Sequence, residues 1–270
     1  MRLGIGSYAY AWSIGVPGYV PPRPMTAFDL LGKAAELGVG VVQICDNLPL
    51  DALSDAELDR LAREAQRQNV RIEVGTRGIR PEHLLGYLRL AQRLQSPILR
   101  AVIDAADHRP LADEVVAMLQ SLVPQFERAG VCLAIENHDR FSAGQFRDMV
   151  QRLDSAQVGI CLDTVNSFGA LEGPEVAVGT LAPWVVSLHV KDFRIRRVEH
   201  QMGFVIEGCP AGEGRLDVPG MIAQLKAAGR DPNAILEQWP PPEDTLDDTI
   251  AKEDRWARAS VAYLRALIKD

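Results

Sequence analysis

Short runs of apolar residues recur along the chain and alternate with longer stretches in which the apolar residues follow helical spacing. Each run is too short for a globular helix and is rich in Val, Ile and Leu, which is typical of strands buried on both faces of a parallel sheet. We find eight such runs, at residues 3–8, 41–45, 71–75, 98–103, 131–136, 158–163, 185–190 and 234–237.

The intervening stretches carry the signals of helix ends. Thr26, Ser54 and Ser142 are expected N-caps, because a residue that can complete a capping box stands three positions after each of them. Pro124 falls inside the helical stretch 111–130, so we expect a break there. The final helix is expected over residues 254–268.

Strand and helix alternate eight times, which predicts an α/β protein with the (β/α)8 architecture, a TIM barrel. A barrel of this kind takes about 250 residues, so we expect one domain over residues 1–270. A doubly wound open sheet is the alternative. It normally has a Gly-x-Gly-x-x-Gly turn after the first strand, and here Gly4 and Gly6 are followed by Ser-Tyr-Ala-Tyr.

Two loops are expected to cover an active site. Residues 192–217, between the seventh strand and its helix, are rich in glycine and read as an irregular insertion. A long loop at this position in a barrel is typical of an active-site lid. The stretch 18–24, after the first strand, is expected to form a second lid.

Composition narrows the class of protein. The chain is 47% hydrophobic and carries a net charge of −7, which argues against disorder and against a nucleic-acid partner. No apolar run approaches ~18 residues, so no membrane span is expected. The first 20 residues lack the pattern of a secretory signal, and the four cysteines form no Cys-x-x-Cys pair, so a cytoplasmic location is expected.

Four consecutive predicted strands end in a residue type that binds metals: Glu136, Asp163, His189 and Glu237. Alone, a carboxylate at a strand end is more often a helix cap or a surface residue than a metal ligand, and a histidine among apolar residues is more often a core residue. In a TIM barrel, however, the active site lies at the carboxyl ends of the strands, and three converging carboxylates repel one another unless a cation compensates them. The oxygen-rich donor set favours Mn²⁺, with Mg²⁺, Co²⁺ or Zn²⁺ as alternatives.

The residues around these positions form recognisable motifs: Ile135-Glu136-Asn137, Leu162-Asp163-Thr164, His189-Val190-Lys191-Asp192, Pro210-x-Gly212-Glu213-Gly214 and Leu236-Glu237. With them, almost the whole chain resembles the xylose isomerase-like TIM barrel family of sugar and sugar phosphate isomerases and epimerases. The resemblance implies that the four strand-end residues are the metal ligands, and that Glu136 and Glu237 are also catalytic proton carriers. Two positions depart from the family, because many relatives carry Glu in place of Gln43 and many epimerases carry His in place of Asn166.

The resemblance implies a divalent-metal-dependent isomerase or epimerase of a small sugar, sugar acid or sugar phosphate, acting through an enediolate. The alternative is a metal-dependent decarboxylase of a 3-oxo sugar acid, because residues near the first strand and around 203–210 are similar to the 3-oxo-isoapionate decarboxylase branch. A dehydratase, an abasic-site endonuclease and a non-catalytic barrel are weaker alternatives. Relatives form dimers or tetramers, so a homo-oligomer is expected.

Polar and aromatic residues near the strand ends are candidates for substrate binding. Lys191 lies two residues after His189 and therefore on the same face. A cationic side chain in the pocket would bind a carboxylate or phosphate, although an arginine on such a loop is often solvated or paired with another residue. The candidate substrate-binding residues are Lys191, Arg194, Arg77, Arg100, His138, Asn166 and Trp12.

Overall fold

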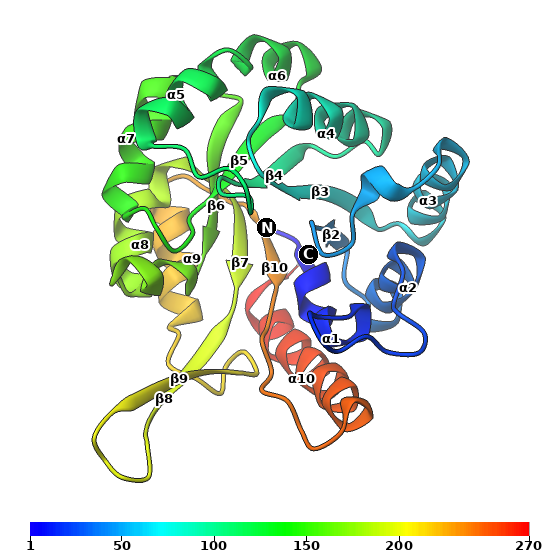
Figure 1. The fold of residues 1–270 in the computed structure, drawn as a ribbon, viewed down its shortest axis with the longest axis vertical. Coiled ribbons are helices and arrows are strands. Elements are labelled where there is room, and N and C mark those ends of the chain that lie inside the picture. The colour runs from blue at the N-terminus through cyan, green and yellow to red at the C-terminus, as the bar shows by residue number, and fades with distance from the viewer. Residues whose placement is uncertain (270) are drawn as a thin grey trace.

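The computed structural model describes residues 1–269, in which eight parallel strands close into a barrel inside a ring of helices (Figure 1). The order around the barrel is β1-β10-β7-β6-β5-β4-β3-β2, which confirms the predicted (β/α)8 architecture. The predicted strand ends agree with the observed ones to within two residues. The barrel strands are β1 (Leu3–Gly6), β2 (Val41–Ile44), β3 (Arg71–Arg77), β4 (Ile98–Val102), β5 (Cys132–Glu136), β6 (Val158–Asp163), β7 (Val185–Val190) and β10 (Asn233–Leu236).

Most helices begin and end where the local signals place them, but the final helix, expected over residues 254–268, spans Leu246–Leu267. It begins earlier because the Thr245 side chain caps it by accepting a hydrogen bond from the Asp248 N–H. Thr26, Ser54 and Ser142 each form the predicted capping box. Pro124 lies in the first turn of α6, where a proline is tolerated, and the predicted break separates α5 from α6. The helices are α1 (Ala11–Ile14), α2 (Ala27–Leu37), α3 (Asp55–Gln68), α4 (Pro81–Arg93), α5 (Ala112–Gln120), α6 (Val123–Ala129), α7 (Ala143–Leu153), α8 (Pro174–Leu181), α9 (Val218–Ala227) and α10 (Leu246–Leu267), with 3₁₀ turns η1 (Ser7–Tyr10), η2 (Leu50–Ala52), η3 (Asn166–Ala170) and η4 (Ala182–Trp184).

The apolar core lies mostly between the barrel and its helices, whereas the barrel interior holds several polar side chains. Gln43, Glu73, Arg100 and Ser187 are all buried, with at most 2% of each residue exposed. Burying a polar group without a hydrogen-bond partner costs free energy, so these side chains need partners inside the barrel. Across the described residues 1–269, no helix combines the length and apolar character needed to cross a bilayer.

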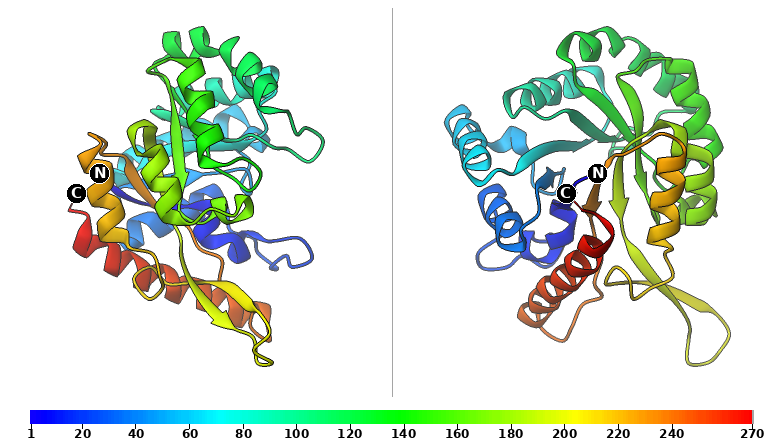
Figure 2. Two further views of the ribbon diagram at one scale, coloured as in Figure 1. Left: turned by 90° about the vertical axis from the view of Figure 1, so that its left-hand side faces the viewer. Right: turned by 180° about the vertical axis from the view of Figure 1, so that it is seen from behind.

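The insertion at residues 192–217 is not the irregular loop that the sequence suggested. Its first part is an antiparallel hairpin of β8 (Asp192–Arg197) and β9 (Phe204–Cys209), which extends away from the barrel (Figures 1 and 2). Apolar and charged residues alternate along β8, whereas β9 begins with three apolar residues, Phe204–Ile206. Ile195 pairs with Ile206, and Arg196 forms a 2.7 Å ion pair with Glu207. The glycines around the hairpin hid this strand pattern. The lid role, like that of residues 18–24, stays a prediction.

Asp192 connects the hairpin to the turn that follows it. Its carboxylate accepts hydrogen bonds from the backbone N–H groups of Gly212, Gly214 and Leu216, at 2.9–3.0 Å. A side chain at position 214 would collide with this carboxylate, which explains the glycine in the Pro-x-Gly-Glu-Gly motif. The turn is thereby held at the carboxyl end of β7.

Candidate metal centre

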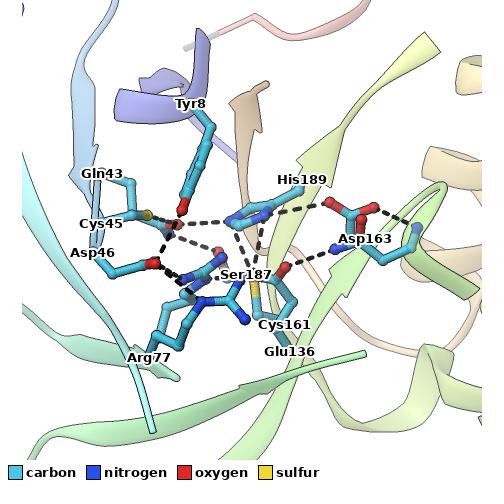
Figure 3. Close-up of polar contacts among 12 residues, drawn as sticks. Tyr8, Gln43, Cys45, Asp46, Arg77, Glu136, Cys161, Asp163, Ser187 and His189 are labelled. Atoms are coloured by element: carbon cyan, nitrogen blue, oxygen red, sulfur yellow. Dashed lines mark hydrogen bonds and ion pairs between the residues drawn. The ribbon is translucent and has the colours of Figure 1, made fainter. Parts of the chain in front are cut away.

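The four predicted ligands converge at the carboxyl end of the barrel, and their side chains are almost completely buried. Glu136 and Asp163 end β5 and β6, His189 lies near the end of β7, and Glu237 follows β10. The Nδ1 atom of His189 is 3.4 Å from Glu136 Oε2, 3.4 Å from Glu237 Oε1 and 3.7 Å from Asp163 Oδ2. Three carboxylates therefore surround one ring nitrogen, as the close-up shows for Glu136 and Asp163 (Figure 3). We call these four residues the metal centre.

The donor atoms of the metal centre fit a divalent cation. Within residues 1–269, neither His189 Nδ1 nor Glu237 Oε1 has a hydrogen-bond partner, although both are buried. Unpartnered buried polar atoms are rare, and a cation would satisfy them. Three carboxylates with one imidazole suit Mn²⁺, Mg²⁺ or Zn²⁺. Geometry also permits a second grouping, in which Glu136 and Cys161 approach the imidazole together.

Lys191 places a positive charge directly on the metal centre. Its Nζ atom lies 2.7 Å from Asp163 Oδ2 and 2.9 Å from Glu237 Oε2. Burial disfavours the charged form of Lys191, but the two carboxylates outweigh burial and hold its pKa well above the ordinary value. Burial likewise opposes the ionised form of Asp163, yet Lys191 holds the pKa of Asp163 well below its usual range. Both groups are therefore charged at neutral pH.

Both oxygens of Glu136 are held by donors. The Nε atom of Arg100 donates to Oε2, and Asn166 Nδ2 donates to Oε1 at 2.8 Å. Burial opposes ionisation of Glu136, but the Arg100 guanidinium lowers its pKa below the ordinary value. Arg100 also donates to Asp46 Oδ1 at 3.0 Å. Glu136 is consequently an oriented, ionised carboxylate.

A cavity of about 640 Å³ opens beside the metal centre. Three of the predicted substrate-binding residues line it: Lys191, Asn166 and Trp12. Tyr8 and Trp239 add aromatic wall, and Ile206 and Glu207 of the hairpin close one side. The cavity thus combines apolar surface with a few polar groups, as small-molecule sites do.

The other predicted substrate-binding residues are held by protein partners. Arg77 donates to Asp46 at 3.1 Å, and Arg100 is bound to Glu136 as described. Arg194 lies on the hairpin, where it pairs with Glu213 at 2.7 Å, and His138 Nδ1 lies 3.1 Å from Asp139. Their contacts with a substrate stay predictions.

Gln43 and Glu73 were not assigned to the site from the sequence, although Gln43 stood out as a departure from the family. Gln43 Oε1 lies 2.6 Å from His189 Nε2, on the side of the ring away from the carboxylates, and Gln43 Nε2 donates to Glu73. Gln43 is labelled beside His189 in Figure 3. The available signal was one polar residue in the middle of each of two apolar runs, 41–45 and 71–75.

Comparisons with known proteins agree with this architecture. The chain is 36% identical over 264 residues to the 3-oxo-isoapionate decarboxylase of Pectobacterium atrosepticum, which covers 98% of this chain and 95% of that protein. D-Psicose 3-epimerase from Clostridium cellulolyticum H10, solved with D-tagatose, has a TM-score of 0.75 at 17% identity and covers 98% of this chain and 99% of its own. The IOLI protein with a bound zinc atom has a TM-score of 0.68 at 18% identity, covering 97% and 99%.

The two solved structures share the barrel fold at low identity, and their names describe a sugar epimerase and a zinc-binding protein. Residues 31–267 match the family profile described as xylose isomerase-like TIM barrel. The profile match and the 36% identical relative lead to the same conclusion. The chain belongs to the xylose isomerase-like TIM barrel family.

Proposed function

We propose that the protein is a divalent-metal-dependent decarboxylase of a 3-oxo sugar acid, with 3-oxo-isoapionate as the reference substrate. The relative that is 36% identical over nearly the whole chain carries that activity in its name. The observation that carries the proposal is the state of Glu136, whose two oxygens are held by Arg100 and Asn166. A carboxylate held in this way is a poor acceptor for a proton from a substrate C–H group.

This feature separates the proposed decarboxylase from an isomerase or epimerase. Proton transfer between neighbouring carbons, or between the two faces of one carbon, needs carboxylates free to remove and return a proton. Glu237 is open toward His189, but Glu136 is engaged on both oxygens. Decarboxylation needs no proton abstraction from carbon, so one engaged glutamate does not impede it. The isomerase or epimerase expected from the resemblance stays the competing prediction.

In the proposed reaction, the bond between the carboxylate carbon and its neighbouring carbon breaks, and CO₂ leaves. The electron pair of that bond moves toward the ketone, and a proton from solvent then adds to the carbon that lost CO₂. When bound by Glu136, Asp163, His189 and Glu237, a divalent cation would supply Lewis acidity to the ketone oxygen. Lys191 would pair with the substrate carboxylate, and Trp12 would cover the sugar face.

The charges of the site favour a substrate with a single negative charge. Glu136, Asp163 and Glu237 carry three negative charges, while Arg100 and Lys191 carry two positive ones, so these groups sum to minus one. A divalent cation would raise the sum to plus one. One substrate carboxylate then brings it to zero, whereas a phosphate dianion leaves excess negative charge in a buried site.

The direct test is to incubate Mn²⁺-loaded protein with 3-oxo-isoapionate in D₂O, measuring CO₂ and following the organic product by NMR. We expect one CO₂ per substrate, one deuterium at the carbon that lost it, and no turnover after the metal is removed with EDTA. Deuterium exchange or ketose interconversion without CO₂ would instead identify an isomerase or epimerase. The choice of Mn²⁺, the cytoplasmic location and the homo-oligomer stay predictions.

A further inference from the structure

We infer that Glu73, acting through Gln43, is a positioning residue that selects which nitrogen of His189 binds the metal ion. The inference rests on the metal centre of the proposed function but on no particular substrate. Glu73 lies on β3, Gln43 on β2 and His189 on β7, and all three side chains point into the closed barrel. Their exposed fractions are 2%, 0% and 0%, so water does not compete for their hydrogen bonds.

A chain of hydrogen bonds fixes the direction of the Gln43 amide. Asn233 Nδ2 donates to Glu73 Oε1 at 2.7 Å, and Gln43 Nε2 donates to Glu73 Oε2 at 3.0 Å. Both carboxyl oxygens of Glu73 accept hydrogen bonds from amide groups, so the NH₂ group of Gln43 faces Glu73. The carbonyl oxygen of Gln43 therefore faces His189, at 2.6 Å from Nε2.

This direction determines the protonation pattern of the imidazole. Because Gln43 Oε1 can only accept, His189 Nε2 must carry a proton. In the neutral ring the lone pair is then on Nδ1, the atom that lies 3.4 Å from both Glu136 and Glu237. Metal-binding histidines commonly donate their other N–H to an acceptor, and losing that acceptor typically costs 10–100-fold in metal affinity.

The same contacts argue against the alternative grouping with Cys161. Its Sγ lies 3.2 Å from His189 Nε2, so a metal ion bound between Cys161 and that nitrogen would need the lone pair of Nε2. Gln43 occupies that nitrogen as a hydrogen-bond acceptor. Cys161→Ala is therefore a matched control beside the same ring.

The variants for the test are Gln43→Met, Glu73→Gln and the exchanged pair, Gln43→Glu combined with Glu73→Gln. Gln43→Met removes the acceptor at nearly constant volume. Glu73→Gln replaces one of the two accepting oxygens that orient the amide with an NH₂ group. The exchanged pair again places an acceptor against His189 and an amide donor behind it. It should therefore restore the Mn²⁺ affinity if the direction of these hydrogen bonds determines it.

Affinity for Mn²⁺ alone is measured from the EPR signal of the free ion, without substrate. We expect Gln43→Met to bind Mn²⁺ 10–100-fold more weakly than the unaltered protein, and Glu73→Gln to have an affinity between the two. The exchanged pair should regain most of the lost Mn²⁺ affinity, and Cys161→Ala should bind Mn²⁺ as the unaltered protein does. Unaltered affinity in Gln43→Met, failed recovery in the exchanged pair, or an equal loss in Cys161→Ala would each overturn the inference.

A spectroscopic measurement decides the matter even if a variant fails to fold. In the Zn²⁺-loaded protein with ¹⁵N-labelled histidine, the His189 ring should show a proton on Nε2 and the metal-bound shift on Nδ1. A proton on Nδ1 would overturn the inference. If the Mn²⁺ binding and NMR results are as expected but the protein releases no CO₂ from 3-oxo-isoapionate, the proposed function is rejected and the inference about Glu73 and Gln43 stands.

Discussion

The Arg100 guanidinium and the Glu136 carboxylate form an ion pair inside the mouth of the barrel, where only 2% and 1% of their side chains are exposed. Burial takes both charges out of water, so each depends on the other for compensation. Arg100 also reaches Asp46, at 3.0 Å, and so links the metal centre to the neighbouring Arg77. A residue expected to bind substrate is thus engaged in orienting one of the predicted metal ligands.

Replacing Arg100 by Met should lower the free energy of unfolding by about 3–5 kcal/mol, because it leaves a buried carboxylate without its partner. The double variant Arg100→Met with Glu136→Gln should lose less, since the uncompensated charge is gone. Urea unfolding of metal-free protein at pH 7 measures both. Equal stability of Arg100→Met and the unaltered protein would contradict a buried, compensated pair.

Replacing Lys191 by Met should weaken binding of the acid substrate by about 10–100-fold, because a charge-assisted hydrogen bond is worth roughly 1.5–3 kcal/mol. The effect should appear in KM and should be smaller for a neutral polyol measured as a competitor. Lys191→Arg keeps the charge and serves as the matched control. An unchanged KM in Lys191→Met would remove Lys191 from the substrate site.

Glu253 should make the stability of the protein depend on pH. It is buried on α10 and accepts hydrogen bonds from the backbone N–H groups of Trp12 and Ser13, at 2.8 and 3.0 Å. Burial raises the pKa of Glu253 from 4.5 to about 7, against these hydrogen bonds. Between those two pH values the folded protein binds more protons than the unfolded chain, so stability falls as pH rises.

The loss attributable to Glu253 should approach about 3 kcal/mol between pH 4.5 and pH 7, and should then level off. Glu253→Gln lacks the titrating group, so its stability should change less over this window, whatever constant offset the amide introduces. Urea unfolding of both proteins at pH 5 and pH 8 supplies the comparison. Parallel pH profiles would show that Glu253 titrates normally.

The barrel was predictable because the strands and helices follow local patterns that the chain repeats eight times. The position of Glu136, Asp163, His189 and Glu237 along the barrel axis was predictable for the same reason, since each lies at or next to the end of its apolar run. The hydrogen-bond partners that meet across the barrel could not be predicted from these local patterns. Gln43 and His189 are 146 residues apart and meet only when the barrel closes.

The partners of the arginines could not be predicted from the sequence either. A strand-end arginine can face a substrate or a neighbouring carboxylate, and residue type alone does not distinguish the two. Arg100 contacts Glu136, and Arg194 of the hairpin contacts Glu213 in the turn that follows it. The hairpin itself was not predicted because its strands lie in a segment whose glycines suggested a loop.

We propose that Glu136, Asp163, His189 and Glu237 jointly bind one divalent cation. Anomalous diffraction at the manganese absorption edge, from a crystal of the protein soaked in Mn²⁺, locates that ion. We expect one anomalous peak within about 2.0–2.5 Å of an oxygen from each carboxylate and of His189 Nδ1. A peak bound through His189 Nε2 and Cys161, or no peak among these four side chains, would show that this site is wrong.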